Sequence, residues 1–207
     1  TDKNRAEIAG LTKDQQKAYQ GLIEFINKPF NHNDFKRALV GAGGVGKTFL
    51  LKTVLKNCNI SFSQIGVSAP SHKACRVLRD NIIGIPCSVN TVQSDFGLRL
   101  NFDIDKFDIN NPPFDPKGNV KVDSYYLYII DEASMINRDL LRFIEKYLKK
   151  AKCKIIYCGD DHQLSPINEY RSEAFSGCKS YKLTQIVRQD DDNPILENHH
   201  RKFSRFS

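Results

Sequence analysis

The sequence lacks the features typical of membrane-spanning proteins, of proteins stabilised by a cysteine-bound metal, and of repeat proteins. No apolar run approaches the ~20 residues of a membrane span, and no signal peptide is visible. Its six cysteines form no C-x-x-C pair, and there is no internal repeat or low-complexity tract. Cys153 and Cys158 lie an odd number of residues apart on a predicted strand, so their thiols point to opposite faces and cannot share a metal. These absences predict a cytoplasmic protein with reduced cysteines and no membrane partner.

The composition is that of an ordinary globular domain. The 207 residues suffice for one substantial domain, and hydrophobic and charged fractions of 40% and 27% are usual for this class. The net charge of +7 suits a polyanionic partner without establishing one. Composition therefore leaves the function to the motifs.

The clearest motif is the glycine-rich segment 41–48, which matches the phosphate-binding pattern G-x-x-x-x-G-K-[ST]. A short apolar run, 38–40, precedes it as a predicted strand, and an apolar stripe of helical spacing follows it. Glycines let main-chain N–H groups wrap an anion, and a helix N-terminus favours phosphate. Lys47 can reach the β- and γ-phosphates, and the Thr48 hydroxyl can bind Mg²⁺. This strand–loop–helix context argues against a functionless glycine-rich turn. Nucleotide contacts are expected at Gly41, Gly43, Gly44, Val45, Gly46, Lys47, Thr48 and Phe49.

Two acidic residues supply chemistry that a phosphate loop lacks. Asp131 and Glu132 follow the apolar segment 126–130, a predicted buried strand. Asp131 and Thr48 offer the hard oxygen ligands that Mg²⁺ prefers, and Glu132 can orient or deprotonate an attacking water. Acidic residues also cap helices after strands, but beside a phosphate loop this pair favours nucleotide hydrolysis. ATP and Mg²⁺ are the expected cofactors, and Lys47, Asp131 and Glu132 are expected to be catalytic.

Three further polar residues have both a functional and a structural interpretation. Gln163 and Arg188 can sense the γ-phosphate and compensate charge in the transition state, or can be surface residues. Gln15 pairs with Thr12 as a capping box at the start of a helix over 12–28, or presents its amide to an adenine edge. Spacing alone favours the cap.

The order of apolar segments predicts an α/β fold. Strands are expected near 38–40, 65–69, 126–130, 155–157 and 181–183. Their alternation with helices is typical of a mostly parallel sheet with helices on both faces. Residues 98–125 interrupt the alternation with three phenylalanines among aspartates and turn signals. We interpret them as a small inserted, hairpin-like projection.

Two polar segments follow predicted strands, where parallel α/β sheets bind ligands. Segment 70–73 reads Pro-Ser-His-Lys, and Ser71 can equally cap an ordinary helix that carries a solvated His and Lys. Segment 91–94, which holds Thr91 and Gln93, is ambiguous in isolation.

Together the motifs resemble the first RecA-like domain of a superfamily 1 DNA helicase, closest to the RecD-like group and its phage Dda-type members. The resemblance runs from Leu11 to about Arg188. Segment 41–48 resembles motif I, and Asp131-Glu132-Ala133-Ser134 resembles motif II. Residues 159–166 are similar to motif III and residues 183–188 to motif IV, which places Arg188 as the γ-phosphate arginine. Residues 11–15 resemble the adenine-reading Q motif, which raises the functional interpretation of Gln15.

The resemblance also implies a DNA surface and a domain plan. Segments 69–74 and 91–94 are similar to blocks that contact single-stranded DNA in the family. The implied contacts are Pro70, Ser71, His72, Lys73, Thr91 and Gln93. Residues 1–97 and 126–207 would form the motor domain 1A. Residues 98–125 would form subdomain 1B, which carries a strand-separating pin in the family.

The sequence departs from the family pattern in several places. Gln185 stands where relatives often have Glu, and Ser165 where many have Pro. Motifs V and VI and the second RecA-like domain have no counterpart in the 207 residues. We expect a monomeric motor domain that needs this second domain, with 5′→3′ translocation in DNA replication or repair, in a host cytoplasm if phage-encoded. The other hypothesis is a nucleotide-dependent DNA-binding or loader module without motor activity.

Overall fold

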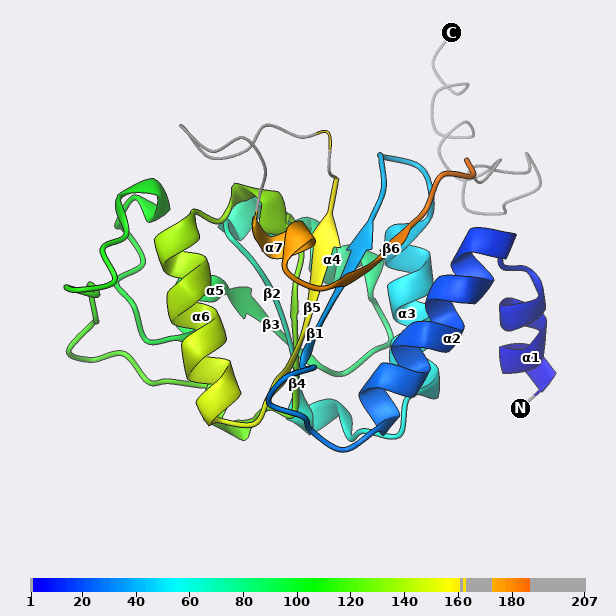
Figure 1. Cartoon of the computed structure of the whole chain (residues 1–207), viewed down its shortest axis with the longest axis horizontal. Helices are drawn as coiled ribbons and strands as arrows, with labels where there is room; N and C mark the ends of the chain where they lie inside the picture. The colour runs from blue at the N-terminus through cyan, green and yellow to red at the C-terminus, as the bar shows by residue number, and fades with distance from the viewer. Residues whose placement is uncertain (1, 161, 163–172, 187–207) are drawn as a thin grey trace, which may run out of the picture.

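The architecture is a six-stranded parallel sheet with helices on both faces (Figure 1). The computed structural model describes residues 2–160, 162 and 173–186. Its strands, in the spatial order β3-β2-β4-β5-β1-β6, are β1 Lys36–Val40, β2 Ile65–Ala69, β3 Ser88–Thr91, β4 Leu127–Ile130, β5 Lys154–Gly159 and β6 Lys179–Lys182. Its helices are α1 Asp2–Ala9, α2 Lys13–Asn27, α3 Lys47–Asn57, α4 His72–Asn81, α5 Val92–Asp95, α6 Arg138–Lys150 and α7 Glu173–Ser176. The predicted α/β class is confirmed.

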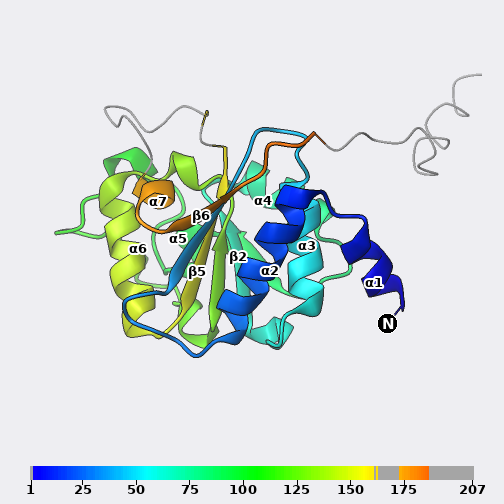
Figure 2. The ribbon, with the colours of Figure 1, turned by 45° about the vertical axis from the view of Figure 1, so that its right-hand side comes forward.

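The three strands β2, β4 and β5 are buried on both faces, because helices pack on each side of the middle of the sheet. All residues of β2, β4 and β5 are buried. Leu39, Ile129 and Ile156 pack with α2, α3 and α4, whereas their strand neighbours Tyr128 and Tyr157 pack with α6 and α7. Figure 2 shows these two helix layers on either side of the sheet. This two-sided burial is characteristic of parallel sheets.

The parallel register brings the carboxyl ends of the strands to one edge. Val40 lies opposite both Gly159 and Lys182, and Ala69 lies opposite Thr91. The segments expected to bind ligands all begin at this edge. Cys153 and Cys158 lie in the two different cores, so the prediction that they face opposite ways is confirmed.

Local sequence sets the start of helix α2, whereas a lysine distant in sequence contacts its end. Thr12 and Gln15 form the predicted capping box, in which the Thr12 N–H donates to Gln15 Oε1 at 3.0 Å. At the other end the ammonium of Lys154 donates to the carbonyl oxygens of Phe25 (2.6 Å), Ile26 (3.0 Å) and Lys28. These carbonyls lack partners inside the helix, so the buried lysine satisfies them.

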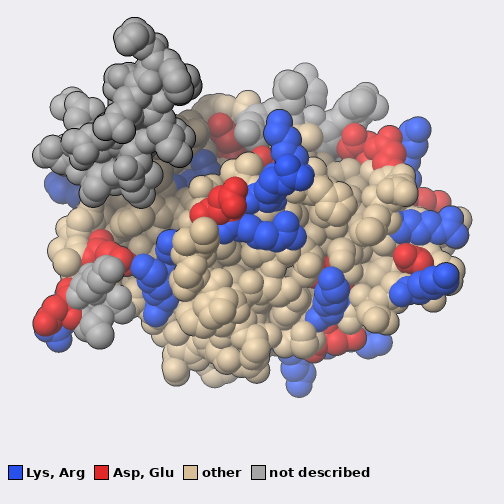
Figure 3. All heavy atoms as spheres, turned by 180° about the vertical axis from the view of Figure 1, so that it is seen from behind, with Lys and Arg blue, Asp and Glu red and all other residues tan. Residues whose placement is uncertain are grey.

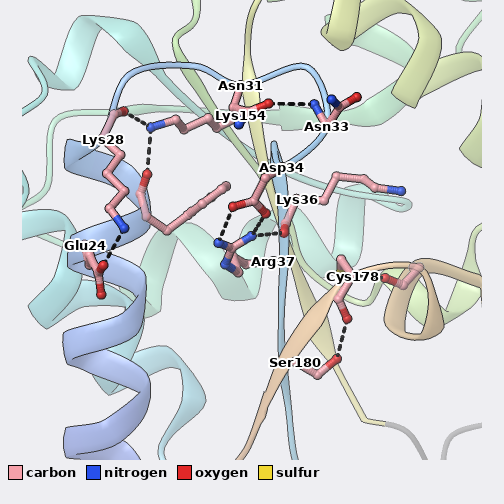
Figure 4. Close-up of polar contacts among 12 residues, drawn as sticks. Glu24, Lys28, Asn31, Asn33, Asp34, Lys36, Arg37, Lys154, Cys178 and Ser180 are labelled. Atoms are coloured by element: carbon pink, nitrogen blue, oxygen red, sulfur yellow. Dashed lines mark hydrogen bonds and ion pairs between the residues drawn. The ribbon is translucent and has the colours of Figure 1, made fainter.

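Lys154 also lines a cavity of about 640 Å³ at the edge of the sheet where β1 and β5 begin (Figure 4). Four of the charged side chains that line it form two ion pairs. Lys28 contacts Glu24, and Arg37 forms a two-point contact with Asp34. We therefore assign this cluster a structural role in joining α2 to the sheet.

The inserted segment has hairpin-like antiparallel contacts but no regular strand, and its role as a separate subdomain stays a prediction. Residues 98–125, all of which the structure describes, form no strand, and two isolated antiparallel bridges join Phe96 to Val120 and Leu98 to Phe114. Phe107 is only 4% exposed, and its ring lies 5.3 Å from that of Phe143 on α6. Phe107 therefore anchors the segment on α6 by burying apolar surface, whereas Phe114 is 46% exposed.

Helix α1 was not predicted, because its sequence has almost no apolar stripe. It lies beside α3, where Glu7 forms an ion pair with Lys56 at 3.1 Å.

Candidate nucleotide site and neighbouring surface

The glycine-rich loop has the backbone that its sequence requires. Gly44 and Gly46 have φ values of 81° and 78°, in the left-handed region that favours glycine, and Gly46 is the N-cap of α3. A Cβ on Gly41 would lie 2.7 Å from the carbonyl oxygen of Leu183, so the close approach of these two backbones needs glycine. The loop therefore joins β1 to the N-terminus of α3 and presents free N–H groups there.

Lys47 folds back over this loop. Its ammonium donates to the carbonyl oxygens of Gly41 (2.5 Å) and Ala42 (2.9 Å). The side chain is half-buried, and Thr48 beside it is also partly accessible. A positive charge and a hydroxyl thus lie at the mouth of the loop, as nucleotide phosphates require.

Asp131 leaves the end of β4 toward the phosphate loop. Its N–H donates to the Ser68 carbonyl at 2.8 Å, and its Oδ1 accepts from the Glu132 N–H at 2.9 Å. Burial raises the pKa of Asp131, while the Glu132 N–H and the positive charge of Lys47 act in the opposite direction. The charge of Lys47 is thus close enough to act on the Asp131 carboxyl, so the two residues belong to the same candidate site.

Glu132 has an uncommon backbone conformation, with φ 50° and ψ 38°. Such left-handed geometry at a non-glycine residue costs of order 1–3 kcal/mol and is concentrated at functional sites. Burial and the charge of Asp131 raise the pKa of Glu132, whereas Lys73 lowers it. The two neighbouring carboxylates therefore interact with different lysines.

The predicted capping role of Gln15 is confirmed, and the same side chain also contacts the phosphate loop. Its Nε2 donates to the Val45 carbonyl at 3.1 Å while its Oε1 accepts from the Thr12 N–H. The side chain is 2% exposed. The amide thus ties α2 to the loop, and contact with adenine stays a prediction.

The expected DNA-contact residues separate into two groups. Ser71, His72 and Lys73 are exposed at the start of α4, although the Ser71 hydroxyl is also the helix cap, accepting from the Ala74 N–H at 3.1 Å. Figure 3 shows the opposite side of the molecule from Figure 1, where Lys and Arg are interspersed with Asp and Glu. Of the residues expected to contact DNA, those with accessible side chains are Ser71, His72 and Lys73 at the start of α4.

The other three residues, Pro70, Thr91 and Gln93, are buried. Thr91 is 4% exposed and caps α5 by accepting from the Ser94 N–H at 3.2 Å. Gln93 is 7% exposed and donates to the carbonyl of Pro70, itself buried, at 3.2 Å. Contact of these three residues with DNA stays a prediction, and burial leaves little of their side chains accessible for it. Their burial depends on β2 and β3 being neighbours, which local sequence does not reveal.

Gln163 and Arg188 lie outside the described residues. Sequence reasoning missed Asp14, which accepts hydrogen bonds from the Thr184 N–H at 2.6 Å and the Gln185 N–H at 3.0 Å. The only local signal was an acidic residue in the first turn of a capped helix, which has an ordinary explanation in the helix dipole.

Thr48 and Asp131 fit a magnesium ion held mainly by phosphate and water. Among the residues that the structure describes, no group of three or more His, Cys, Asp or Glu side chains gathers into a metal site. Mg²⁺ at a phosphate loop needs only one or two carboxylates with a hydroxyl. The chemistry of the donor set therefore suits Mg²⁺ bound together with a nucleotide.

Comparison with known proteins agrees with this geometry. A family model described as an AAA domain matches residues 11–202. The chain belongs to this family. The AAA domain also resembles the crystal structure of Pif1 helicase from Candida albicans, with a TM-score of 0.55 and 21% identity over 90% of this chain and 42% of that chain. The family match and this shared fold agree with the predicted RecA-like domain.

Two further similarities cover larger proteins. The AAA domain is 32% identical over 177 residues to the uncharacterized protein R530 of Acanthamoeba polyphaga mimivirus, which is 78% of this chain and 35% of that protein. It also resembles the Drosophila ORC bound to DNA, with a TM-score of 0.43 and 16% identity over 88% of this chain and 47% of that chain. The chain thus spans about a third of the length of its curated relative. Within the described residues, no helix has the length and apolarity to cross a membrane.

Proposed function

We propose that this AAA domain is the ATP- and Mg²⁺-dependent motor domain of a DNA helicase that grips single-stranded DNA. The observation that carries the proposal is the sheet order. Strand β4, which ends in Asp131 and Glu132, lies between β2, which leads to Lys73, and β5, which pairs with the strand that leads to Lys47. The carboxylates therefore stand between a nucleotide half and a polar, basic half of the same sheet edge.

The residues of this edge divide the work of hydrolysis. The loop N–H groups and Lys47 bind and orient the phosphates, and Thr48 and Asp131 would hold Mg²⁺. When bound, the ion would supply positive charge to the phosphate oxygens. Glu132 accepts a proton from the attacking water. Gln163 and Arg188 are proposed to contact the γ-phosphate.

The proposed DNA contacts are Ser71, His72 and Lys73, with Thr91 and Gln93 holding the neighbouring loops in place. A conformational change at α4 on DNA binding would act next to Glu132, because Lys73 and Glu132 interact electrostatically. Translocation in the 5′→3′ direction and a facing second RecA-like domain are supported by the family resemblance. The facing domain would complete the charge compensation of the transition state.

A DNA-dependent ATPase assay tests the proposal. We expect residues 1–207 alone to bind nucleotide weakly and to hydrolyse little ATP, and a longer protein that includes the facing domain to hydrolyse ATP faster when single-stranded DNA is added. If DNA leaves the turnover of the longer protein unchanged while nucleotide still binds, the motor assignment is wrong. A nucleotide-dependent loader module would then be the better assignment.

A further inference from the structure

Asp14 connects two parts of the chain that lie far apart in sequence. Its carboxylate accepts from the Thr184 N–H at 2.6 Å and the Gln185 N–H at 3.0 Å, both in the segment that follows β6. In return, the Asp14 N–H donates to Gln185 Oε1 at 3.4 Å. The same carboxylate accepts from Thr12 Oγ1 and the Gln15 N–H within α2.

The carboxylate is charged under all ordinary conditions. Partial burial acts to raise the pKa of Asp14, but hydrogen bonds from Thr12, Thr184, Gln185 and Gln15 outweigh it and lower the pKa to about 2. Hydrogen bonds to a charged acceptor are stronger than those between neutral groups. A solvated acid whose only role was to interact with the helix dipole would not need two donors from another segment.

The residues next to both partners of this contact touch the phosphate loop or the strand that leads into it. On one side Gln15, next to Asp14, donates to the Val45 carbonyl at 3.1 Å. On the other side the Leu183 N–H donates to the Val40 carbonyl at 2.8 Å. The Leu183 carbonyl packs so closely on Gly41 that a Cβ there would lie 2.7 Å away. Two residues of the loop are therefore held from either side: Val45 by α2 and Gly41 by Leu183.

We propose that Asp14 is a positioning residue of the nucleotide site. It holds residues 183–185 and the start of α2 together around the phosphate loop, so that the loop keeps its phosphate-binding backbone. The same contact fixes the positions of Thr184 and Gln185, which precede Arg188 in the sequence. The proposal rests on the nucleotide-binding function proposed above, and it assigns Asp14 no contact with the nucleotide.

Two substitutions separate this role from simple helix capping. Asp14→Asn removes the charge, and Asp14→Ser keeps a hydroxyl that can accept from its own helix but is too short to reach residues 184 and 185. Asp80→Asn, at an exposed site on α4, is the matched control for lost charge. The measurements are amide hydrogen exchange at Thr184 and Gln185 and titration with a fluorescent ATP analogue and Mg²⁺.

We expect both Asp14 variants to lose about tenfold or more of the protection at the two amides, with several-fold weaker nucleotide binding, since each lost hydrogen bond involves a charged acceptor. Asp80→Asn should change neither quantity. Unchanged protection, or lost protection with the affinity of the parent protein, would overturn the proposal. Lys47→Ala distinguishes failure of the proposed function from failure of the Asp14 proposal. If this variant binds nucleotide like the parent, the proposed nucleotide-binding function is wrong. The hydrogen exchange at Thr184 and Gln185 still decides whether Asp14 holds residues 183–185.

Discussion

At the scale of single residues, the site depends on a few side chains that the surrounding backbone places at one edge. Lys47 lies over the glycine-rich loop, and Asp131 and Glu132 share a turn but interact with different lysines. Glu132 also has a left-handed backbone conformation. Substitutions at these positions should therefore change function far more than folding.

Lys47→Ala should abolish useful nucleotide binding, because it removes the positive charge at the β- and γ-phosphates. Titration with a fluorescent nucleotide in the presence of Mg²⁺ measures this loss. Lys146→Ala, an exposed lysine on α6, is the matched control and should bind like the parent. Equal affinity of Lys47→Ala and the parent would contradict the phosphate-loop assignment.

Glu132→Gln should separate binding from hydrolysis. The amide keeps the size of the side chain but cannot accept the proton, so ATP affinity should be retained while hydrolysis falls by roughly 10² or more. Single-turnover hydrolysis in a longer protein that turns over ATP gives the rate, and nucleotide titration gives the affinity. Turnover at the parent rate would remove Glu132 from the role of base.

At the scale of elements, two contacts between elements that are separate in sequence contribute to stability. Helix α5 joins β4 through a buried carboxylate: Asp95 accepts from the Tyr128 hydroxyl at 2.9 Å and from Asn90 Nδ2 at 3.0 Å. The inserted segment joins α6 through Phe107 and a neighbouring exposed ring, Phe114. For each of these two contacts we predict a different effect on the free energy of unfolding.

The α5–β4 junction should make stability fall as pH rises from about 4 to 6. Burial raises the pKa of Asp95 from 3.8 to about 6, although the Tyr128 and Asn90 hydrogen bonds act against it. Between these values the folded protein holds a proton that the unfolded chain releases, so ionisation costs stability. Urea unfolding should show Asp95→Asn gaining about 1–3 kcal/mol relative to the parent between pH 4 and 7. A difference that does not change with pH would contradict this.

The inserted segment should tolerate change at its exposed ring but not at its buried one. Phe107→Ala should lower the free energy of unfolding by about 3–5 kcal/mol, because it leaves a cavity beside Phe143. Phe114, which is 46% exposed, is the matched comparison and should cost clearly less when changed to Ala. Chemical denaturation measures both. Equal losses would mean that the segment packs differently from the structure described.

At the scale of the whole molecule, the sheet edge divides into a nucleotide half and a basic half. Strands β1 and β6 lead to the phosphate loop and to residues 183–185, whereas β2 and β3 lead to α4 and α5. The net charge of +7 is modest, so affinity for nucleic acid must come mainly from local contacts.

Binding to single-stranded DNA should therefore be weak and should depend steeply on salt. Each phosphate contact changes the slope of log affinity against log salt by about −0.7 for single strands. Lys73→Ala should reduce the slope by about one such step, and Lys146→Ala should leave it unchanged. Fluorescence anisotropy with a labelled oligonucleotide over a salt series gives the slopes. A slope insensitive to Lys73, or a preference for blunt duplex, would contradict the proposed surface.

The sequence by itself determined what depends on near neighbours along the chain. The loop 41–48 takes its left-handed backbone from its own glycines, and the capping box at Thr12 and Gln15 closes within one helical turn. The apolar segments and the turns between them likewise specify strands and helices through local periodicity. This local information explains why the α/β class, the nucleotide motif and the acidic pair were all predictable.

Only the tertiary structure decided which distant segments meet. The contact of Asp14 with Thr184 joins residues 170 positions apart, and the burial of Gln93 depends on the pairing of β2 with β3. The burial of Phe107 depends in the same way on where α6 lies. Such contacts follow from strand order and helix packing, which involve the whole chain at once, so no local pattern could have revealed them.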